Sequence, residues 1–237
     1  MIRASLLLLL ALLPMQPLMA EEVAADEPSS SSRDPWEKLN RQIYRFNQGV
    51  DRVFFKPLAI TSETYVPAPI TLGVKNFFSN LGDVGVAVNN LLQGKFRDSL
   101  SDSGRILVNS TMGLAGLFDV ATRMGLDKHY EDFGQTLGRW GAPSGPYLVI
   151  PLFGPSSLRD SAGVVGDLAL DPVVYAREAE VIVGLFILRA VNTRGELLTV
   201  TDLLEQAALD PYAFERDSWL QKRAFDIRDG SFEDEDF

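Results

Sequence analysis

Residues 132–160, DFGQTLGRWGAPSGPYLVIPLFGPSSLRD, constrain the fold more than any other part of the chain. Five glycines in this segment allow backbone angles or close approaches that a side chain would block, and four prolines fix φ and remove amide donors. We therefore expect an irregular segment that is held rigid. The apolar run at 147–153 predicts a buried or lipid-facing connector between helices.

The N-terminus has the pattern of a secretory signal peptide. Arg3 precedes an apolar stretch at residues 6–13, and cleavage is expected after Ala20. We predict that residues 1–20 direct export and are then removed. The stretch is too short to span a bilayer, which needs about 20 apolar residues, and no later segment is long enough.

Shifts in composition divide the remaining chain into three parts. Residues 21–33 are acidic and then serine-rich, which predicts a flexible tether. No polar linker interrupts residues 34–225, so we expect one folded domain there. Residues 226–237 contain six acidic side chains, which predicts a disordered acidic tail.

The overall composition excludes several functions. A formal net charge of −10 argues against nucleic acid as a partner, because binding to phosphates needs clustered cations. The sequence contains no cysteine, which excludes disulfides, thiolate nucleophiles and cysteine-ligated metals within it. We expect a fold that is held by packing alone, with no cofactor and no metal.

Hydrophobic periodicity predicts an all-α fold, because strand-like alternation is almost absent. Asp34, Asp171 and Asp210 are each followed by a proline, a combination that is typical of a helix start. Further helices are expected at residues 69–94 with an interruption at Gly82, at 100–109, at 113–121 and at 172–192.

Residues 181–188 form an uninterrupted apolar run inside the last of these helices. A helix that is apolar on every side is either buried in a core or partly immersed in lipid. The sequence leaves both interpretations open.

The sequence offers little for catalysis. His129 is the single histidine, and its polar neighbours predict an inert, exposed loop residue. No nucleophile elbow, phosphate-binding loop, dinucleotide fingerprint or zinc motif is present, so we predict that the protein is not an enzyme. The remaining enzymatic alternative is a two-carboxylate hydrolase of the cell envelope. Its candidate acids lie beside apolar sequence: Asp119, Asp132, Asp160 and Asp167.

Three charged residues, Arg105, Arg159 and Asp160, lie in apolar or glycine-rich surroundings. A buried charge is costly unless it is paired or faces water. These residues therefore form structural ion pairs or caps, with Asp160 three residues after an N-cap Ser157, or they line a polar path through the protein. The sequence favours the structural interpretation.

Six stretches of the sequence, taken together and in order, resemble the MlaA (VacJ) family of Gram-negative outer membranes. They cover nearly all of residues 34–212. The matching stretches are DPWEKLNRQIYRFN at 34–47, YVPAP at 65–69, NFFSNL at 76–81, NNLLQG at 89–94, RILVNSTMGLAGLFDVA at 105–121 and the segment at 132–160. Each stretch is a weak signal alone, but the ordered set is specific.

The resemblance implies an all-α protein, a single ring-shaped domain of amphipathic helices with a central polar channel. It implies a non-enzymatic component on the periplasmic side of the outer membrane, which removes mislocalised phospholipids from the outer leaflet and so maintains lipid asymmetry. The implied partners are phospholipid, the outer membrane, a trimeric porin and a periplasmic phospholipid carrier protein.

The resemblance also implies a lipid channel with a gating loop. Gly141 and Gly145 match the family's loop beside the channel, whereas Pro143 stands where a third glycine is usual and should stiffen the loop. Phe46 and Asn47 match the start of an N-terminal Phe/Asn segment near the channel. Gln48 replaces the aromatic residue that usually follows.

Typical members of the family are lipoproteins with a lipobox cysteine just after the signal, and this sequence has no cysteine. It therefore predicts no acyl anchor, so that retention at the membrane depends on the amphipathic helices and on contact with a porin. A soluble periplasmic lipid-binding carrier is the alternative function.

Overall fold

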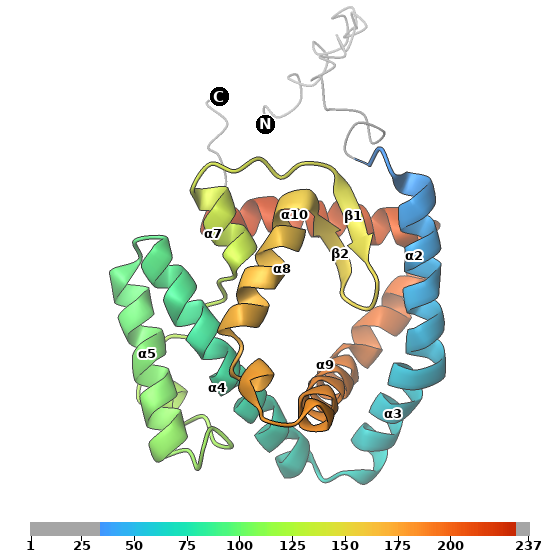
Figure 1. The fold of residues 1–237 in the computed structure, drawn as a ribbon. Helices are drawn as coiled ribbons and strands as arrows, with labels where there is room; N and C mark the ends of the chain where they lie inside the picture. Colours follow the sequence, from blue (N-terminus) through green and yellow to red (C-terminus); the bar gives the residue numbers. More distant parts are fainter. Residues whose placement is uncertain (1–33, 231–237) are drawn as a thin grey trace, which may run out of the picture.

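The computed structural model describes residues 34–230, without the side chains of residues 205–207. The predicted signal peptide at 1–20, the tether at 21–33 and residues 231–237 of the acidic tail lie outside these residues. The described chain is mostly helical and closes into a ring (Figure 1). The prediction of a ring-shaped, helical domain is confirmed, with one short β-hairpin added.

The ring is built from a bent helical arm, a helical hairpin and a set of shorter elements that close it (Figure 1). The arm consists of α2 (Glu37–Val50), a π-helical turn (Asp51–Phe55) and α3 (Lys56–Tyr65), and the hairpin of α4 (Ala68–Leu92) and α5 (Phe96–Thr111). The remaining elements are α6 (Val120–Arg123), α7 (Phe133–Arg139), β1 (Tyr147–Ile150), β2 (Gly154–Ser157), α8 (Leu158–Leu170), a 3-10 turn (Pro172–Tyr175), α9 (Ala179–Ala207) and α10 (Pro211–Ile227).

The bend of the arm has a local cause. Pro57 is the second residue of α3 and has no amide hydrogen, so regular α-helical bonding cannot continue across it. The π-helical turn directly before α3 takes up the change in register. The arm can therefore curve around one side of the ring.

Two of the three predicted aspartate caps are confirmed. Asp171 and Asp210 accept hydrogen bonds from backbone amides in the turns that follow them. Asp34 is different, because α2 begins after a further turn and has no side-chain cap. The buried Asp34 carboxylate instead accepts hydrogen bonds from Asn40 Nδ2 at 2.8 Å and from Tyr212 Oη at 2.5 Å. A tertiary contact has replaced the local one.

Three predicted helix limits were wrong. Helix α4 runs through Gly82 without interruption. The helix expected at 172–192 breaks after the 3-10 turn, and α9 begins only at residue 179. Helix α9 also continues to Ala207, past the end expected at residue 192.

The helix predicted at 113–121 is replaced by a turn and the four-residue α6. Leu114, Ala115 and Gly116 have φ of 51°, 58° and 91°, so the backbone is left-handed there. A Cβ at Gly113 would overlap two backbone carbonyls, and one at Gly116 would lie 2.8 Å from Asn80 of α4. These glycines therefore permit a tight turn against a helix, where the sequence predicted a short helix.

The apolar run at 147–153 forms one strand and the tip of an antiparallel hairpin, where we expected a connector between helices. Tyr147 pairs with Ser157, and Ile150 pairs with Gly154. Tyr147 and Val149 are buried, and Leu148 and Ile150 are half-buried. All four residues of β1 are apolar, so no alternation reveals the strand in the sequence.

The apolar run at 181–188 lies in α9, which has no fully buried residue among the side chains that the structure describes. Val181, Val183 and Leu188 are exposed. The interpretation of a core helix is therefore wrong. Across residues 34–230, no helix is both long enough and apolar enough to cross a membrane.

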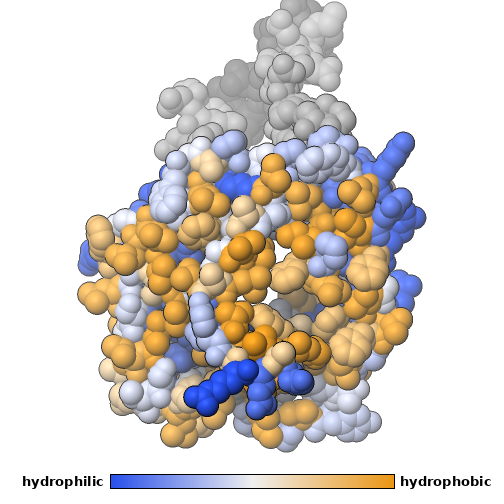
Figure 2. Space-filling view, viewed as in Figure 1, coloured by the Kyte–Doolittle hydropathy of each residue, from blue (hydrophilic) through white to orange (hydrophobic). Residues whose placement is uncertain are grey.

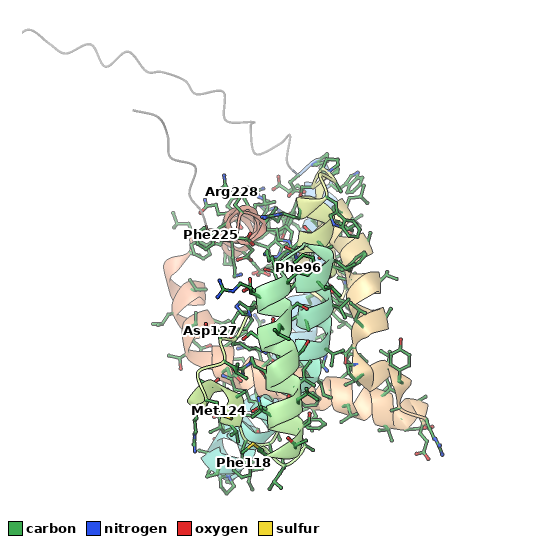
Figure 3. The ribbon with its side chains drawn as sticks, turned by 90° about the vertical axis from the view of Figure 1, so that its left-hand side faces the viewer. Phe96, Phe118, Met124, Asp127, Phe225 and Arg228 are labelled. Carbon is green, nitrogen blue, oxygen red and sulfur yellow. The ribbon has the colours of Figure 1, made fainter. Side chains whose placement is uncertain are left out.

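The distribution of polarity is the reverse of that in an ordinary globular domain. Among the described residues, seventeen buried side chains are polar or charged and eight are hydrophobic. Hydrophobic side chains cover most of the face in Figure 2. Phe96, Phe118 and Met124 extend this exposed apolar surface along the outer side of α5 and the turns after it (Figure 3). The helices therefore meet through polar contacts and direct much of their apolar surface outwards.

Candidate functional site

The molecule is hollowed at the centre of the ring (Figure 2). Helices α8 and α9, the α2–α3 arm and the β-hairpin surround this opening, and the tip of the hairpin hangs into it (Figure 1). The side chains at its edge are mostly hydrophobic on the face shown in Figure 2. The polar lining that the resemblance implies remains a prediction.

Asn40 of α2 holds the root of the β-hairpin. Its side chain is 1% exposed. Nδ2 donates to the Tyr147 carbonyl at 3.1 Å, and Oδ1 accepts from the Val149 amide at 3.0 Å. The carboxamide therefore satisfies the free edge of β1 as a neighbouring strand would.

Asn47, a predicted channel residue, makes the same kind of contact at the hairpin tip. Its Nδ2 donates to the Ile150 carbonyl at 3.0 Å, and its Oδ1 accepts from the Leu152 amide at 2.8 Å. Phe46, the other residue predicted from this segment, is 55% exposed. Sequence reasoning missed Asn40, although its spacing of seven residues from Asn47 places both on one helix face.

Residues 140–146 connect α7 to the hairpin and contain the two predicted gating-loop glycines. Gly141 and Gly145 have φ of 90° and 68°, values that a residue with a side chain rarely adopts. Pro143 is exposed between them. The loop therefore has a conformationally permissive residue at each end and a stiff residue in its middle.

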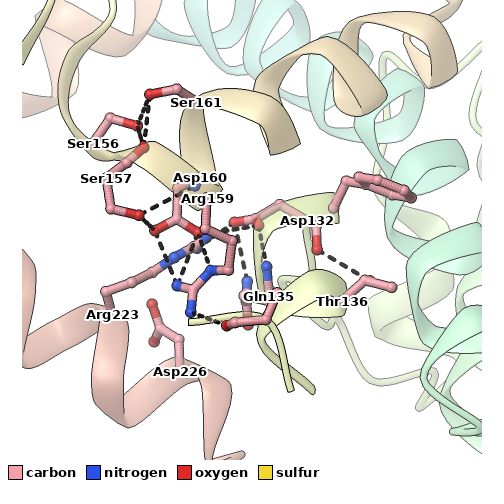
Figure 4. A network of polar contacts seen from close by, with 12 residues as sticks. Asp132, Gln135, Thr136, Ser156, Ser157, Arg159, Asp160, Ser161, Arg223 and Asp226 are labelled. Carbon is pink, nitrogen blue, oxygen red and sulfur yellow. Dashed lines mark hydrogen bonds and ion pairs between the residues drawn. The ribbon is translucent and has the colours of Figure 1, made fainter. Parts of the chain in front are cut away.

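An ion-pair network joins α7, α8 and α10 beside this loop (Figure 4). Asp160 accepts hydrogen bonds from Ser157 Oγ at 2.6 Å, from Arg159 Nη2 at 3.0 Å and from Arg223 Nη2 at 2.7 Å. Arg223 also donates to both carboxylate oxygens of Asp132, at 2.5 and 2.6 Å. Ser157 caps α8, as predicted. Sequence reasoning missed Arg223, because nothing local separates it from the other charged residues of α10.

The charges in this network stabilise one another. Burial alone would raise the pKa of the Asp132 carboxyl, but the hydrogen bonds and charge of Arg223 outweigh burial and hold that pKa below its usual range. Burial would lower the pKa of Arg223, but its bonds to Asp132 and Asp160 raise it. Asp132 and Arg223 are therefore both ionised at neutral pH.

Arg105, the third charged residue singled out in the sequence, belongs to a separate cluster between α4, α5 and α6. Its side chain is 2% exposed and lies 3.4 Å from Asp83 and 3.2 Å from Asp119. Its Nη1 donates to the Leu126 carbonyl at 2.8 Å. Arg105, Arg159 and Asp160 are all buried among protein partners, and a position of these residues along a polar path stays a prediction.

His129 is half-buried, where we expected an exposed loop residue. Its Nδ1 lies 3.1 Å from Asp102 Oδ1. Asp102 is buried on α5 and also accepts a hydrogen bond from Asn90 Nδ2 at 2.8 Å. The contact therefore holds the segment before α7 against the α4–α5 hairpin.

Three of the four acids proposed for a hydrolase have structural contacts. Asp119 caps α6, Asp132 caps α7, and Asp160 lies in the ion-pair network. Burial would raise the pKa of Asp119, but the hydrogen bonds from Thr122 and the charge of Arg105 lower it to about 2. These partners account for the three carboxylates without a catalytic role.

Asp167 has the opposite shift. Burial raises the pKa of its carboxyl to about 6, and the charge of Asp132 adds to this effect. Its Oδ1 accepts hydrogen bonds from the Phe133 amide at 2.8 Å and from Asn89 Nδ2 at 3.4 Å. Asp167 therefore ties the first residue of α7 to α8 and to α4.

Two cavities of about 420 Å³ each lie between α7, α10, the segment before α7 and the α4–α5 hairpin. One of them is lined in part by Asp132, Gln135 and Arg223. Water can therefore reach the α10 side of the network from this cavity.

These features define a class of ring-shaped helical proteins. Buried polar networks hold the ring together, apolar side chains lie on its outside, and a hairpin hangs in its opening. The model of the family described as MlaA lipoprotein matches residues 32–226. This chain belongs to the MlaA lipoprotein family.

Relatives and a solved structure agree with this assignment. The Shigella flexneri protein named intermembrane phospholipid transport system lipoprotein MlaA is 36% identical over 196 residues, which cover 81% of this chain and 77% of the relative. The protein of the same name from Escherichia coli K12 is 35% identical over 196 residues, which also cover 81% of this chain and 77% of the relative. A solved structure, described as the structural basis for maintenance of bacterial outer membrane lipid asymmetry, has a TM-score of 0.72 and 32% identity. The match covers 82% of this chain and 98% of the chain in the solved structure.

Replacing Asn40 tests the clamp on the hairpin root. Asn40→Ala leaves the Tyr147 carbonyl and the Val149 amide without partners in a buried site, so the free energy of unfolding should fall by about 2–4 kcal/mol. Urea unfolding followed by circular dichroism measures this. The control is Asn76→Ala, which removes one exposed hydrogen bond to the Leu117 carbonyl and should cost less than about 1 kcal/mol. Equal losses in the two variants would contradict the clamp.

Replacing Asp167 tests its raised pKa. Because the folded-state pKa of about 6 exceeds the ordinary value, the stability contribution is fully present below that ordinary value and is lost as the pH rises through about 6. Asp167→Asn keeps the acceptor oxygen but cannot titrate, so the free energy of unfolding should depend less on pH between about 4 and 7. Asp119→Asn is the control, since a pKa of about 2 leaves that window unaffected. An unchanged slope in Asp167→Asn would refute the shift.

Proposed function

We propose that the protein is an outer-membrane component of an intermembrane phospholipid transport system. It takes mislocalised phospholipids from the outer leaflet and passes them to a periplasmic phospholipid carrier protein, which maintains lipid asymmetry. Membership of the MlaA family and the names of the similar proteins support this role. The mechanism is transport through an opening and involves no chemical reaction.

The single observation that carries the proposal is the reversed polarity of the ring. Exposed hydrophobic side chains cover the outside, and buried polar groups hold the helices together. Such a surface is costly in water but favourable in lipid. We infer that the ring lies in the inner leaflet of the outer membrane, on its periplasmic side, and that a trimeric porin is its neighbour there.

A central opening solves the physical problem of moving a phospholipid. A charged headgroup that crosses hydrocarbon loses its hydration, whereas acyl chains drawn into water cost about 0.8 kcal/mol per CH₂ group. A ring embedded in lipid offers the headgroup a path while the acyl chains stay near apolar surface. The opening at the centre of the ring (Figure 2) supports this proposal.

The hairpin and the loop before it are the parts best placed to control the opening. The hairpin tip hangs into it (Figure 1), and Asn47 holds that tip to α2. Phe46 offers an exposed aromatic surface beside Asn47. Gly141 and Gly145 supply the backbone freedom that a moving loop requires. We assign these four residues to the lipid channel and its gate.

Deletion of the gene tests the function. Phospholipid in the outer leaflet, measured by labelling at the cell surface, should rise in the deletion strain and return to normal when the gene is restored. The protein should sediment with outer membranes and co-purify with a trimeric porin. A normal leaflet composition would contradict the transport role, and a protein that stays in the soluble fraction at every salt concentration would favour a periplasmic carrier.

The role of Asn47 has its own test. Asn47→Ala removes both hydrogen bonds that hold the hairpin tip to α2. The hairpin then no longer controls the opening, and phospholipid should equilibrate between the leaflets. A strain that carries Asn47→Ala should therefore show raised outer-leaflet phospholipid at normal protein abundance. The control is Asn76→Ala, which lies away from the hairpin and should restore the wild-type composition. Equal restoration by both variants would exclude Asn47 from the gate.

A further inference from the structure

The loop at 140–146 is bound to the first turn of α8 through two residues. The Leu158 amide donates to the Pro146 carbonyl at 3.1 Å, and Arg159 makes the other contacts. The Arg159 amide donates to the Ser144 carbonyl at 3.1 Å. Its guanidinium Nη1 donates to the Ala142 carbonyl at 3.4 Å. The same Nη1 packs on Gly138 in the last turn of α7, where a Cβ would lie 3.1 Å from it. Arg159 therefore touches both the loop and the helix that leads into it.

Neighbouring charges hold the guanidinium in this position. Its Nε and Nη2 donate to Asp160 at 3.1 and 3.0 Å (Figure 4). Asp160 is in turn held by Arg223 of α10 at 2.7 Å. Gly134 lies against Arg223 and Asp160 so closely that a Cβ would overlap both. One face of α7 therefore consists of two glycines, each covered by an arginine from another helix.

The helices on either side of the loop are fixed independently of Arg159. A Cβ at Gly163 of α8 would lie 2.5 Å from the Gly134 amide, so α7 and α8 are in backbone contact. Trp140 Nε1 donates to the Leu92 carbonyl at 3.1 Å and secures the end of α7 to α4. Loss of the guanidinium contact would therefore loosen the loop around Ala142, while the backbone bonds to α8 and the contact of the two helices remain.

We propose that Arg159 is a positioning residue that latches the loop at 140–146 against α7 and α8, and that Arg223 braces this latch through Asp160. The idea deepens the proposed function, on which its role in gating rests, because the loop leads into the hairpin that hangs in the opening. The C-terminal helix α10 thereby becomes part of the device that sets the position of the gate.

Hydrogen exchange of the purified protein tests the latch. Arg159→Lys keeps a cation beside Asp160, but one ammonium group cannot also reach the Ala142 carbonyl. Exchange of the backbone amides at 140–146 should accelerate about tenfold, the factor for loss of one charge-assisted hydrogen bond, while the amides of α8 keep their protection. The control is Arg139→Lys, at an exposed ion pair with Asp229, which should leave the loop unchanged.

A second variant keeps the test decisive if Arg159→Lys folds poorly. Gly138→Ala adds a methyl group that pushes the guanidinium away from the loop, and alanine favours the helical conformation of α7. Faster exchange confined to the loop supports the latch. Wild-type exchange in the loop overturns it, and so does acceleration spread equally over α8, because Arg159 would then only stabilise the fold.

The lipid measurement separates the latch from the transport role. Raised outer-leaflet phospholipid in the Arg159→Lys strain, together with faster exchange of the loop, supports both. Faster exchange with a normal leaflet composition supports the latch and removes the loop from the proposed transport.

Discussion

Polar groups that satisfy one another where helices meet hold this structure together, because a ring has no single central core. The buried hydrophobic cluster is small and is formed by Tyr147, Val149 and Tyr212. Elsewhere the helices join through pairs such as Asn90 with Asp102 and through the arginine networks. Each buried charge or amide is costly alone and stabilising when paired, so the position of every helix depends on its partners.

The same constraint connects the fold to the proposed function. A protein that faces lipid gains little from burying apolar surface between its own helices, since the surrounding lipid is equally apolar, whereas hydrogen bonds and ion pairs still hold them together. Apolar side chains that face outwards and polar pairs between the helices are therefore both suited to a surrounding of lipid. The hairpin has the same kind of support. Asn40 of α2 satisfies the free edge of β1, Asn47 of α2 binds the hairpin tip, and Arg159 of α8 contacts the loop.

Much of the helical framework could be predicted from local signals. Ser157, Asp171 and Asp210 cap the elements that they were expected to start, because a cap needs only the residues of the next turn. The prediction of a helix start from local signals was wrong where a contact with a distant residue competes with the cap. The carboxylate of Asp34 bonds to Tyr212 of α10 rather than to the start of α2, and that choice depends on a helix at the other end of the chain.

By itself the sequence determined the helical class, the caps, the absence of cysteine chemistry and the ordered motifs of the MlaA family, since these depend on composition and on residues close together in the chain. Only the tertiary structure decided that residues 147–157 form a hairpin, that Asn40 and Asn47 bind its edge, and that Arg223 completes the network beside the loop. The physical reason is that buried polar groups select partners by position in space. The chain brings residue 40 to residues 147 and 149, and residue 223 to residues 132 and 160, only when it folds.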